Sequence, residues 1–232
     1  MFRAHPDEVG GPMKALRLAS LWPGHTRIQL GTRQLVSAPR AGLTIVQATE
    51  FSFEGLHQHR GMIRERLLEI LTNPPVVRPN WGSGDYAAVH IRLGDFVQVQ
   101  PEQIMTGTVP NMRISLAWYD RVIRRVRSVF PDLPIHIFSD GREDELADIL
   151  ALEGVRLRRE PTDIGDLLAL AQAKLLIGSN STFSRWAAFL GDMPSIWLKT
   201  KMPPEQPTSD RTAIHYVADD CDVITRESVA VT

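Results

Sequence analysis

Cysteine is almost missing from this 232-residue sequence, and an excess of either charge is missing as well. The single cysteine, Cys221, cannot form a disulfide within the chain, and no His/Cys cluster surrounds it, which excludes a disulfide framework and a zinc ribbon. We therefore expect a reducing compartment, the cytoplasm. Because 26 basic residues balance 27 acidic ones, we expect no nucleic-acid partner bound by bulk neutralisation of phosphates.

Long apolar runs are also missing. The first thirty residues lack the apolar stretch of a signal peptide, and no later segment approaches the roughly 20 apolar residues of a membrane span. Hydrophobic residues still make up 43% of the chain and charged residues 23%, as in an average globular protein. We therefore expect a folded, soluble protein with no integral membrane segment.

Proline and glycine gather in residues 73–84 and predict a boundary there. We place a small N-terminal lobe at residues 1–80 and a larger domain at residues 81–232. Apolar periodicity in the lobe predicts two short strands and one helix. The strands are expected at 27–30 and 43–48 and the helix at 61–71.

Beyond the boundary, strands and helices alternate, which is typical of βαβ units. Strands are expected at 86–91, 134–138, 155–158, 174–178 and 195–198, and helices at 115–130, 143–152, 164–173 and 182–190. Ser115 and Ser181 suit helix N-caps, and Gly154 and Gly191 stand where a helix can end in a left-handed residue. The sequence thus predicts an α/β fold with a parallel sheet covered by helices on both faces.

The first candidate site follows the strand at 86–91, because ligands of open α/β sheets bind beyond the carboxyl ends of the strands. The two-residue period of a strand places His90 and Arg92 on one face. An arginine there can bind a diphosphate through paired hydrogen bonds, and the imidazole can bond to a base, a sugar or a phosphate. A plain Arg–Asp salt bridge beside a turn glycine explains the same spacing about equally well.

A second segment places four small polar residues between a strand and a helix: Ser179, Asn180, Ser181 and Thr182. Backbone N–H groups and the helix dipole make such a turn an anion site, and the hydroxyls add donors. Ordinary N-capping accounts for one of the four residues but not for the whole run. Upstream, Asp166 lies in the first turn of the helix expected at 164–173, where an acidic residue is also common for structural reasons.

In this order the segments resemble the fucosyltransferase superfamily, in particular the α-1,2-fucosyltransferase family (glycosyltransferase family 11). His-Ile-Arg-Leu-Gly-Asp-Phe at 90–96 is similar to the family's His-x-Arg-Arg-Gly-Asp-Tyr motif. Ile-Phe-Ser-Asp at 137–140 resembles its second motif and residues 166–186 its third, so that the resemblance spans residues 86–198. It implies a GT-B-like fold with a Rossmann-like C-terminal domain that binds GDP-fucose without a metal or cofactor, and an N-terminal lobe on the acceptor side.

The resemblance also implies roles for individual residues. Arg92 would bind the β-phosphate, and His90 and Asp166 would contact the nucleoside. The segment from Ser179 to Thr182 would bind the diphosphate, mainly through its last two hydroxyls. Leu93 stands where the family has a second arginine, which lowers the positive charge expected at the site.

The implied reaction is an inverting transfer of fucose to a hydroxyl of a glycan. Asp95 is the first candidate for a base that removes the acceptor's proton, and Glu102 is the second. A turn or surface carboxylate explains each of them as well. Two other interpretations stay open: a non-catalytic nucleotide- or sugar-binding module, and a glycosyltransferase that uses another nucleotide sugar.

Overall fold

The computed structural model describes residues 26–30, 44–48, 53, 56–71, 79–99, 103, 112–199, 213–216 and 224–225. Cys221 and the candidate base Glu102 lie outside the described residues. In the predicted lobe, strands β1 (Thr26–Leu30) and β2 (Thr44–Ala48) pair in parallel, and the 3-10 turn η2 (His57–His59) leads into helix α2 (Arg60–Glu69). These elements confirm the predicted strands and helix, whereas the division at residues 80 and 81 stays a prediction.

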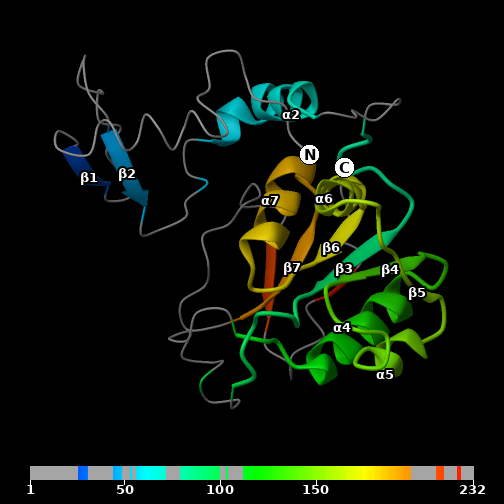
Figure 1. Cartoon of the computed structure of the whole chain (residues 1–232). Helices are drawn as coiled ribbons and strands as arrows, with labels where there is room; N and C mark the ends of the chain where they lie inside the picture. The colour runs from blue at the N-terminus through cyan, green and yellow to red at the C-terminus, as the bar shows by residue number, and fades with distance from the viewer. Residues whose placement is uncertain are drawn as a thin grey trace.

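One six-stranded parallel sheet forms the centre of the molecule (Figure 1). Its strands are β3 (Ala87–Ile91), β4 (Ile135–Ser139), β5 (Val155–Leu157), β6 (Leu175–Ile177), β7 (Ser195–Leu198) and β8 (Ala213–Tyr216). They lie in the order β5-β4-β3-β6-β7-β8. Strands β3, β4 and β5 therefore follow one another from the centre to one edge of the sheet, and β6, β7 and β8 from the centre to the other edge. This is the strand order of a Rossmann fold. This sheet confirms the predicted α/β fold with a Rossmann-like domain, and β8 is a strand that the sequence did not predict.

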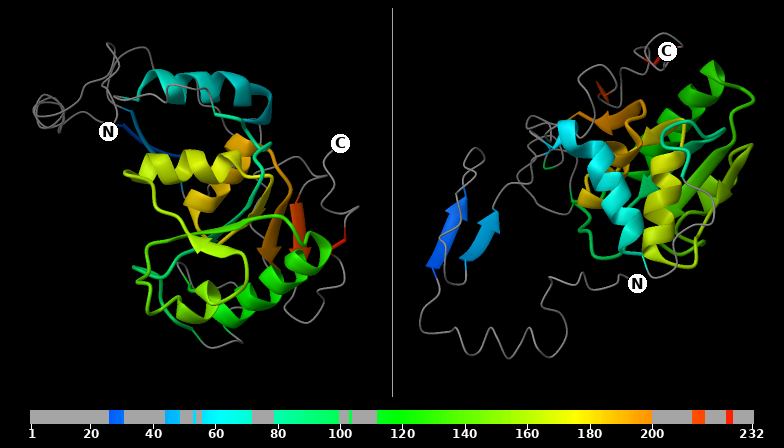
Figure 2. Two further views of the ribbon diagram at one scale, coloured as in Figure 1. Left: turned by 90° about the vertical axis from the view of Figure 1, so that its right-hand side faces the viewer. Right: turned by 90° about the horizontal axis from the view of Figure 1, so that it is seen from above.

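Helices cover both faces of this sheet, as predicted (Figures 1 and 2). Helices α4 (Leu116–Val129) and α5 (Ala147–Leu150) lie on one face, and α6 (Asp163–Gln172) and α7 (Thr182–Gly191) lie on the other. Successive residues of β3 serve opposite faces: Val89 packs into the core under α4, and Ala88 packs into the core under α6 and α7. Because all five residues of β3 are buried, the strand is apolar apart from His90.

The two predicted N-caps are confirmed: the Oγ of Ser115 accepts a hydrogen bond from the N–H of Trp118, and Ser181 caps α7 in the same way. Gly154 is left-handed, with φ +71°, but it lies in the turn before β5 and not at the end of α5, which ends at Leu150. The prediction for Gly191 is wrong, because the left-handed residue at the end of α7 is Asp192, with φ +55°.

The helix predicted at 143–152 is shorter than expected, with only Ala147–Leu150 helical. Arg142 bonds locally just before it: its N–H donates to Glu145 Oε2 at 3.0 Å, and its guanidinium pairs with Asp144. Such bonds between side chains and nearby groups compete with helix formation and keep these residues in a turn.

Helix α2 is fixed to the C-terminal end of α7. Arg64 donates from Nε to the carbonyl of Leu190 at 2.6 Å and from Nη2 to that of Gly191 at 3.2 Å. Arg60 pairs with Asp192 at the same helix end. Because the last carbonyls of a helix have no partners within it, Arg64 satisfies groups that α7 leaves open, while Arg60 pairs with the carboxylate of the C-cap residue.

Candidate functional site

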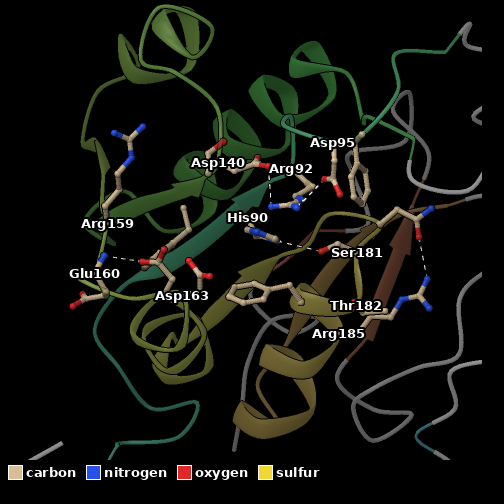
Figure 3. Close-up of a pocket in the computed structure, with 16 residues that line it drawn as sticks. His90, Arg92, Asp95, Asp140, Arg159, Glu160, Asp163, Ser181, Thr182 and Arg185 are labelled. Carbon is tan, nitrogen blue, oxygen red and sulfur yellow. Dashed lines mark hydrogen bonds and ion pairs between the residues drawn. The ribbon is translucent and has the colours of Figure 1, made fainter. Parts of the chain in front are cut away.

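A pocket of about 1020 Å³ opens at the carboxyl edge of the sheet (Figure 3). Its walls come from the segments that follow β3, β4, β5 and β6, so the pocket lies at the point where the strand order reverses. The structure brings seven of the predicted residues to its lining: His90, Arg92, Asp95, Asp166, Asn180, Ser181 and Thr182.

Arg92 follows directly after β3, and its guanidinium lies between two carboxylates. Nη2 is 2.8 Å from Asp95 Oδ1, and Nη1 is 2.8 Å from Asp140 Oδ2. The guanidinium carbon also lies 5.7 Å from the centre of the Phe96 ring, within the range of a cation–π contact. The Arg–Asp salt bridge that the spacing allowed is therefore present, and it forms within the pocket rather than away from it.

Asp140 holds the segment after β3 in place. Its Oδ1 accepts the N–H of Leu93 at 2.8 Å, and its Oδ2 accepts the N–H of Gly94 at 2.9 Å as well as the ion pair with Arg92. A Cβ atom on Gly94 would overlap Asp140 Oδ2, so glycine is required for this close approach. Both carboxylate oxygens are thus bound, and Arg92 is directed into the pocket.

Leu93 is turned away from the pocket and is buried in the core under α4, with 4% of its surface exposed. The residue that replaces the family's second arginine therefore serves packing in this chain. Positive charge reaches the pocket from other segments, through Arg159 after β5 and Arg185 in α7.

His90 is buried, and three serine hydroxyls surround its Nδ1. Ser184 Oγ lies at 2.6 Å, Ser179 Oγ at 3.0 Å and Ser181 Oγ at 3.5 Å. Burial lowers the pKa of His90 to about 4, with a further lowering by Arg92 and an opposing effect of Asp140. The imidazole is therefore neutral at pH 7 and can bond to a ligand without adding charge to the pocket.

The N-terminus of α7 forms the wall opposite Arg92 (Figure 3). Ser181 Oγ accepts the N–H of Ser184 at 3.2 Å, and Thr182 is the first helical residue. Asn180 is oriented by Arg185, whose Nη2 donates to its Oδ1 at 3.0 Å. Because a helix N-terminus carries partial positive charge and N–H groups without helical partners, this wall suits an anionic ligand.

Acidic side chains at the start of α6 form another wall. Asp166 lines the pocket, and its Oδ1 accepts the N–H of Glu160 at 2.7 Å. Burial raises the pKa of Asp166, against the lowering effect of this N–H. Asp163 and Glu160, which is paired with Arg158 through Oε1, lie beside it, so this end of the pocket offers carboxylate acceptors next to the guanidinium of Arg159.

Two predicted residues stand apart from the lining. Ser179 is buried behind the pocket, where its N–H and hydroxyl bond to Ser184 Oγ at 3.0 Å. Glu102 lies outside the described residues, so its role stays a prediction.

Sequence reasoning assigned no role to Asp140, Arg159, Ser184 or Arg185. Asp140 follows directly after β4, so the strand-end rule that selected Arg92 would also have selected it. Ser184 carries no such signal, because its contact with His90 depends on how α7 packs against β3.

Within the described ranges, no helix has the length and apolar character needed to cross a membrane. The same residues include no group of three or more His, Cys, Asp or Glu side chains arranged to hold a metal ion.

Several solved structures, two of them of a heptosyltransferase, are similar to this chain at low identity. The E. coli heptosyltransferase WaaC with ADP is 15% identical with a TM-score of 0.38 and covers 62% of this chain and 42% of its own. The same enzyme with ADP-2-deoxy-2-fluoro heptose is 16% identical with a TM-score of 0.39 and covers 79% and 48%. TarM is 17% identical with a TM-score of 0.39 and covers 61% and 27%. This chain therefore spans less than half the length of each of them.

No curated protein matches the chain. A match to Glycosyl transferase family 11 extends over residues 59–217, which is more than half of the sequence. The matched range contains helix α2, all six strands of the central sheet and every lining residue of the pocket. Because the family model matches this range and the motifs meet at one pocket at the strand ends, the chain belongs to glycosyl transferase family 11.

Proposed function

We propose that this chain transfers fucose from GDP-fucose to a hydroxyl of a glycan, with inversion at the anomeric carbon and without a metal ion. One observation carries the proposal: Arg92 and the N-terminus of α7, which come from opposite halves of the sheet, face each other across one pocket. A guanidinium and a helix N-terminus are both suited to bind the two phosphates of a nucleotide sugar.

The acidic wall supports guanine as the base. Guanine presents a ring N–H and an amino group on one edge, and these donors need acceptors. Asp166 lines the α6 end of the pocket and can supply an acceptor, and Glu160 beside it is paired with Arg158 through Oε1. The diphosphate then lies toward Arg92 and Thr182, which line the same pocket. His90, which is neutral and lies between the two ends, bonds to the ligand without repelling or attracting its charge.

The same groups suit an inverting transfer. The acceptor hydroxyl attacks the anomeric carbon on the side opposite the diphosphate, and the bond from that carbon to the phosphate oxygen breaks with its electron pair going to GDP. Arg92 and the N–H groups of α7 stabilise the charge that develops on the departing GDP. Asp95, at the mouth of the pocket with a 65% exposed side chain, takes up the hydroxyl proton.

Calorimetric titration with GDP, GDP-fucose, GDP-mannose and UDP tests the donor. We expect selective binding of GDP and GDP-fucose, loss of both in Arg92→Ala, and no change in Arg142→Ala, which removes an exposed arginine outside the pocket. Tighter binding of another nucleotide sugar would replace the donor, and no binding at all would contradict the proposed function.

Release of GDP from GDP-fucose in the presence of glycan acceptors tests catalysis. We expect release to depend on an acceptor and to continue in EDTA. Selective GDP binding without transfer to any acceptor would favour a non-catalytic nucleotide-binding module, and loss of activity in EDTA would contradict metal independence.

A further inference from the structure

We propose that the two carboxylates on Arg92 have different roles: the donor's diphosphate displaces Asp95 from Arg92, whereas Asp140 stays. Donor binding then frees the Asp95 carboxylate at the mouth of the pocket. This inference rests on the proposed function, because it requires an anionic ligand at Arg92.

The two carboxylates are held very differently. Asp140 accepts the N–H groups of Leu93 and Gly94 in addition to pairing with Arg92, and its side chain is 26% exposed. If it left, two backbone donors next to the pocket would lose their acceptor, which costs free energy in a partly buried place. Asp140 is therefore a fixed partner of Arg92.

Asp95 has fewer contacts than Asp140. Its side chain is 65% exposed, and within the described part of the chain its ion pair is with Arg92 alone. Since an exposed ion pair of this kind contributes little net stability, a phosphate oxygen can replace it at small cost. Asp95 lies three residues after Arg92, so rotation of its own side chain is sufficient to release it.

The geometry of the guanidinium permits this exchange. Nη1 faces Asp140 and Nη2 faces Asp95, so the two carboxylates occupy different N–H groups. A phosphate that takes the Nη2 position leaves the contact of Asp140 with Nη1 intact. Asp140 is thus a positioning residue that keeps Arg92 directed into the pocket before and after the exchange.

The exchange links donor binding to the acceptor step. While Asp95 pairs with Arg92, its Oδ1 is engaged and the carboxylate is held against the guanidinium. Once the diphosphate takes its place, repulsion between the carboxylate and the phosphates keeps Asp95 away from Arg92. The freed carboxylate then accepts the proton of the attacking hydroxyl as the new bond to the anomeric carbon forms and GDP leaves.

Substitutions of the two aspartates are expected to have opposite effects on ligand affinity. Asp95→Asn removes the competitor, so GDP and inorganic pyrophosphate bind about two- to fivefold more tightly. Guanosine has no phosphate and binds to this variant as to the unaltered protein. In Asp140→Asn, an amide N–H₂ replaces one of the oxygens that accept hydrogen bonds in the unaltered protein. Arg92 is then held less well, so GDP binds at least about fivefold more weakly.

The matched control is Asp144→Asn, which removes a carboxylate from an exposed pair with Arg142 outside the pocket. We expect it to bind all three ligands as the unaltered protein does. In turnover with GDP-fucose, Asp95→Asn should lower KM for the donor and also lower kcat, a combination that a merely structural role would not give.

The outcomes separate a failure of the carboxylate exchange from a failure of the proposed function. Equal or weaker binding of pyrophosphate by Asp95→Asn overturns the exchange, and equal or tighter GDP binding by a folded Asp140→Asn overturns the fixed role of Asp140. If Asp140→Asn does not fold, Asp95→Asn alone decides. If the unaltered protein binds none of the three ligands, the proposed function fails together with this inference. GDP binding that Arg92→Ala abolishes but Asp95→Asn leaves unchanged overturns the inference alone.

Discussion

Leu93 packs against Gly141 so closely that a Cβ atom on the glycine would overlap the leucine side chain. This contact joins the segment after β3 to the segment after β4. Gly94, in the segment after β3, contacts Asp140, in the segment after β4, and so joins the same two segments a second time. The position of Arg92 between them therefore depends on two glycines that line no part of the pocket.

Replacement of Gly94 by alanine should disturb this junction. The new Cβ would overlap Asp140 Oδ2, so we expect the free energy of unfolding in urea to fall by about 1–3 kcal/mol, with weaker GDP binding in the same protein. Gly61→Ala is the control, because a Cβ there meets no atom within 4 Å in helix α2. It should raise stability by about 0.5–1 kcal/mol. Equal stability of Gly94→Ala and the unaltered protein would contradict the overlap.

Removal of the Ser184 hydroxyl should destabilise the buried centre of the site. His90 Nδ1 and the N–H of Ser179 both contact this oxygen, so Ser184→Ala leaves buried polar groups with fewer partners. We expect a loss of about 1–3 kcal/mol in unfolding free energy. Ser128→Ala removes an exposed hydroxyl that bonds to the carbonyl of Arg125, and it should change stability by less than about 0.5 kcal/mol. A similar effect of both variants would show that the contact with His90 contributes nothing.

Stability should fall on acidification because of His90. Burial lowers its pKa from 6.5 to about 4, so the unfolded chain binds a proton at a higher pH than the folded protein does. The stabilising contribution is complete above pH 6.5 and is lost progressively as the pH falls toward 4.

Between pH 7 and pH 5 this loss amounts to about 2 kcal/mol. Urea unfolding of the unaltered protein and of His90→Gln at the two pH values measures it, and the variant should lose less stability on acidification. Burial also lowers the pKa of His136, but that contribution is common to both proteins and cancels in the comparison. The same pH dependence in both would contradict a neutral, buried His90.

Two arginines of α2 test how much the bonds between α2 and α7 contribute to stability. Arg64 donates to the last carbonyls of α7 and lies 5.1 Å from the centre of the Trp81 ring, so Arg64→Ala should cost about 1–2 kcal/mol of unfolding free energy. Arg66 forms an exposed pair with Glu69, and Arg66→Ala should cost less than about 0.5 kcal/mol. If the two variants lost equal stability, α2 would not be fixed by these bonds.

The sheet and its helices could be predicted from the sequence because each element carries its own local signal. The buried strand β3, the N-cap serines and the left-handed Gly154 all follow from neighbouring residues. Where two local signals compete, the prediction is less accurate. The N–H of Arg142 bonds to the side chain of Glu145, so that α5 begins later than predicted, and Asp192 takes the left-handed position expected for Gly191.

The site was predictable only in part, for a different reason. Arg92 and Ser181 stand at strand and helix ends, and the rule that ligands bind at strand ends selects such positions. The contact between Arg92 and Asp140 joins two strands, and that between His90 and Ser184 joins a strand to a helix. Neither follows from spacing along the chain, because each depends on how distant elements pack.

The strand order also determines when the site can exist during folding. Ala87 of β3 pairs with Ile135 of β4 and with Leu175 of β6, so both neighbours of the central strand are supplied by residues far along the chain. Parallel pairing of this kind is slow because distant segments must meet before any contact stabilises them. A chain emerging from the ribosome would thus carry Arg92 long before Thr182 is made. The ability to bind a nucleotide should appear late and in one step, when β6 and α7 join β3.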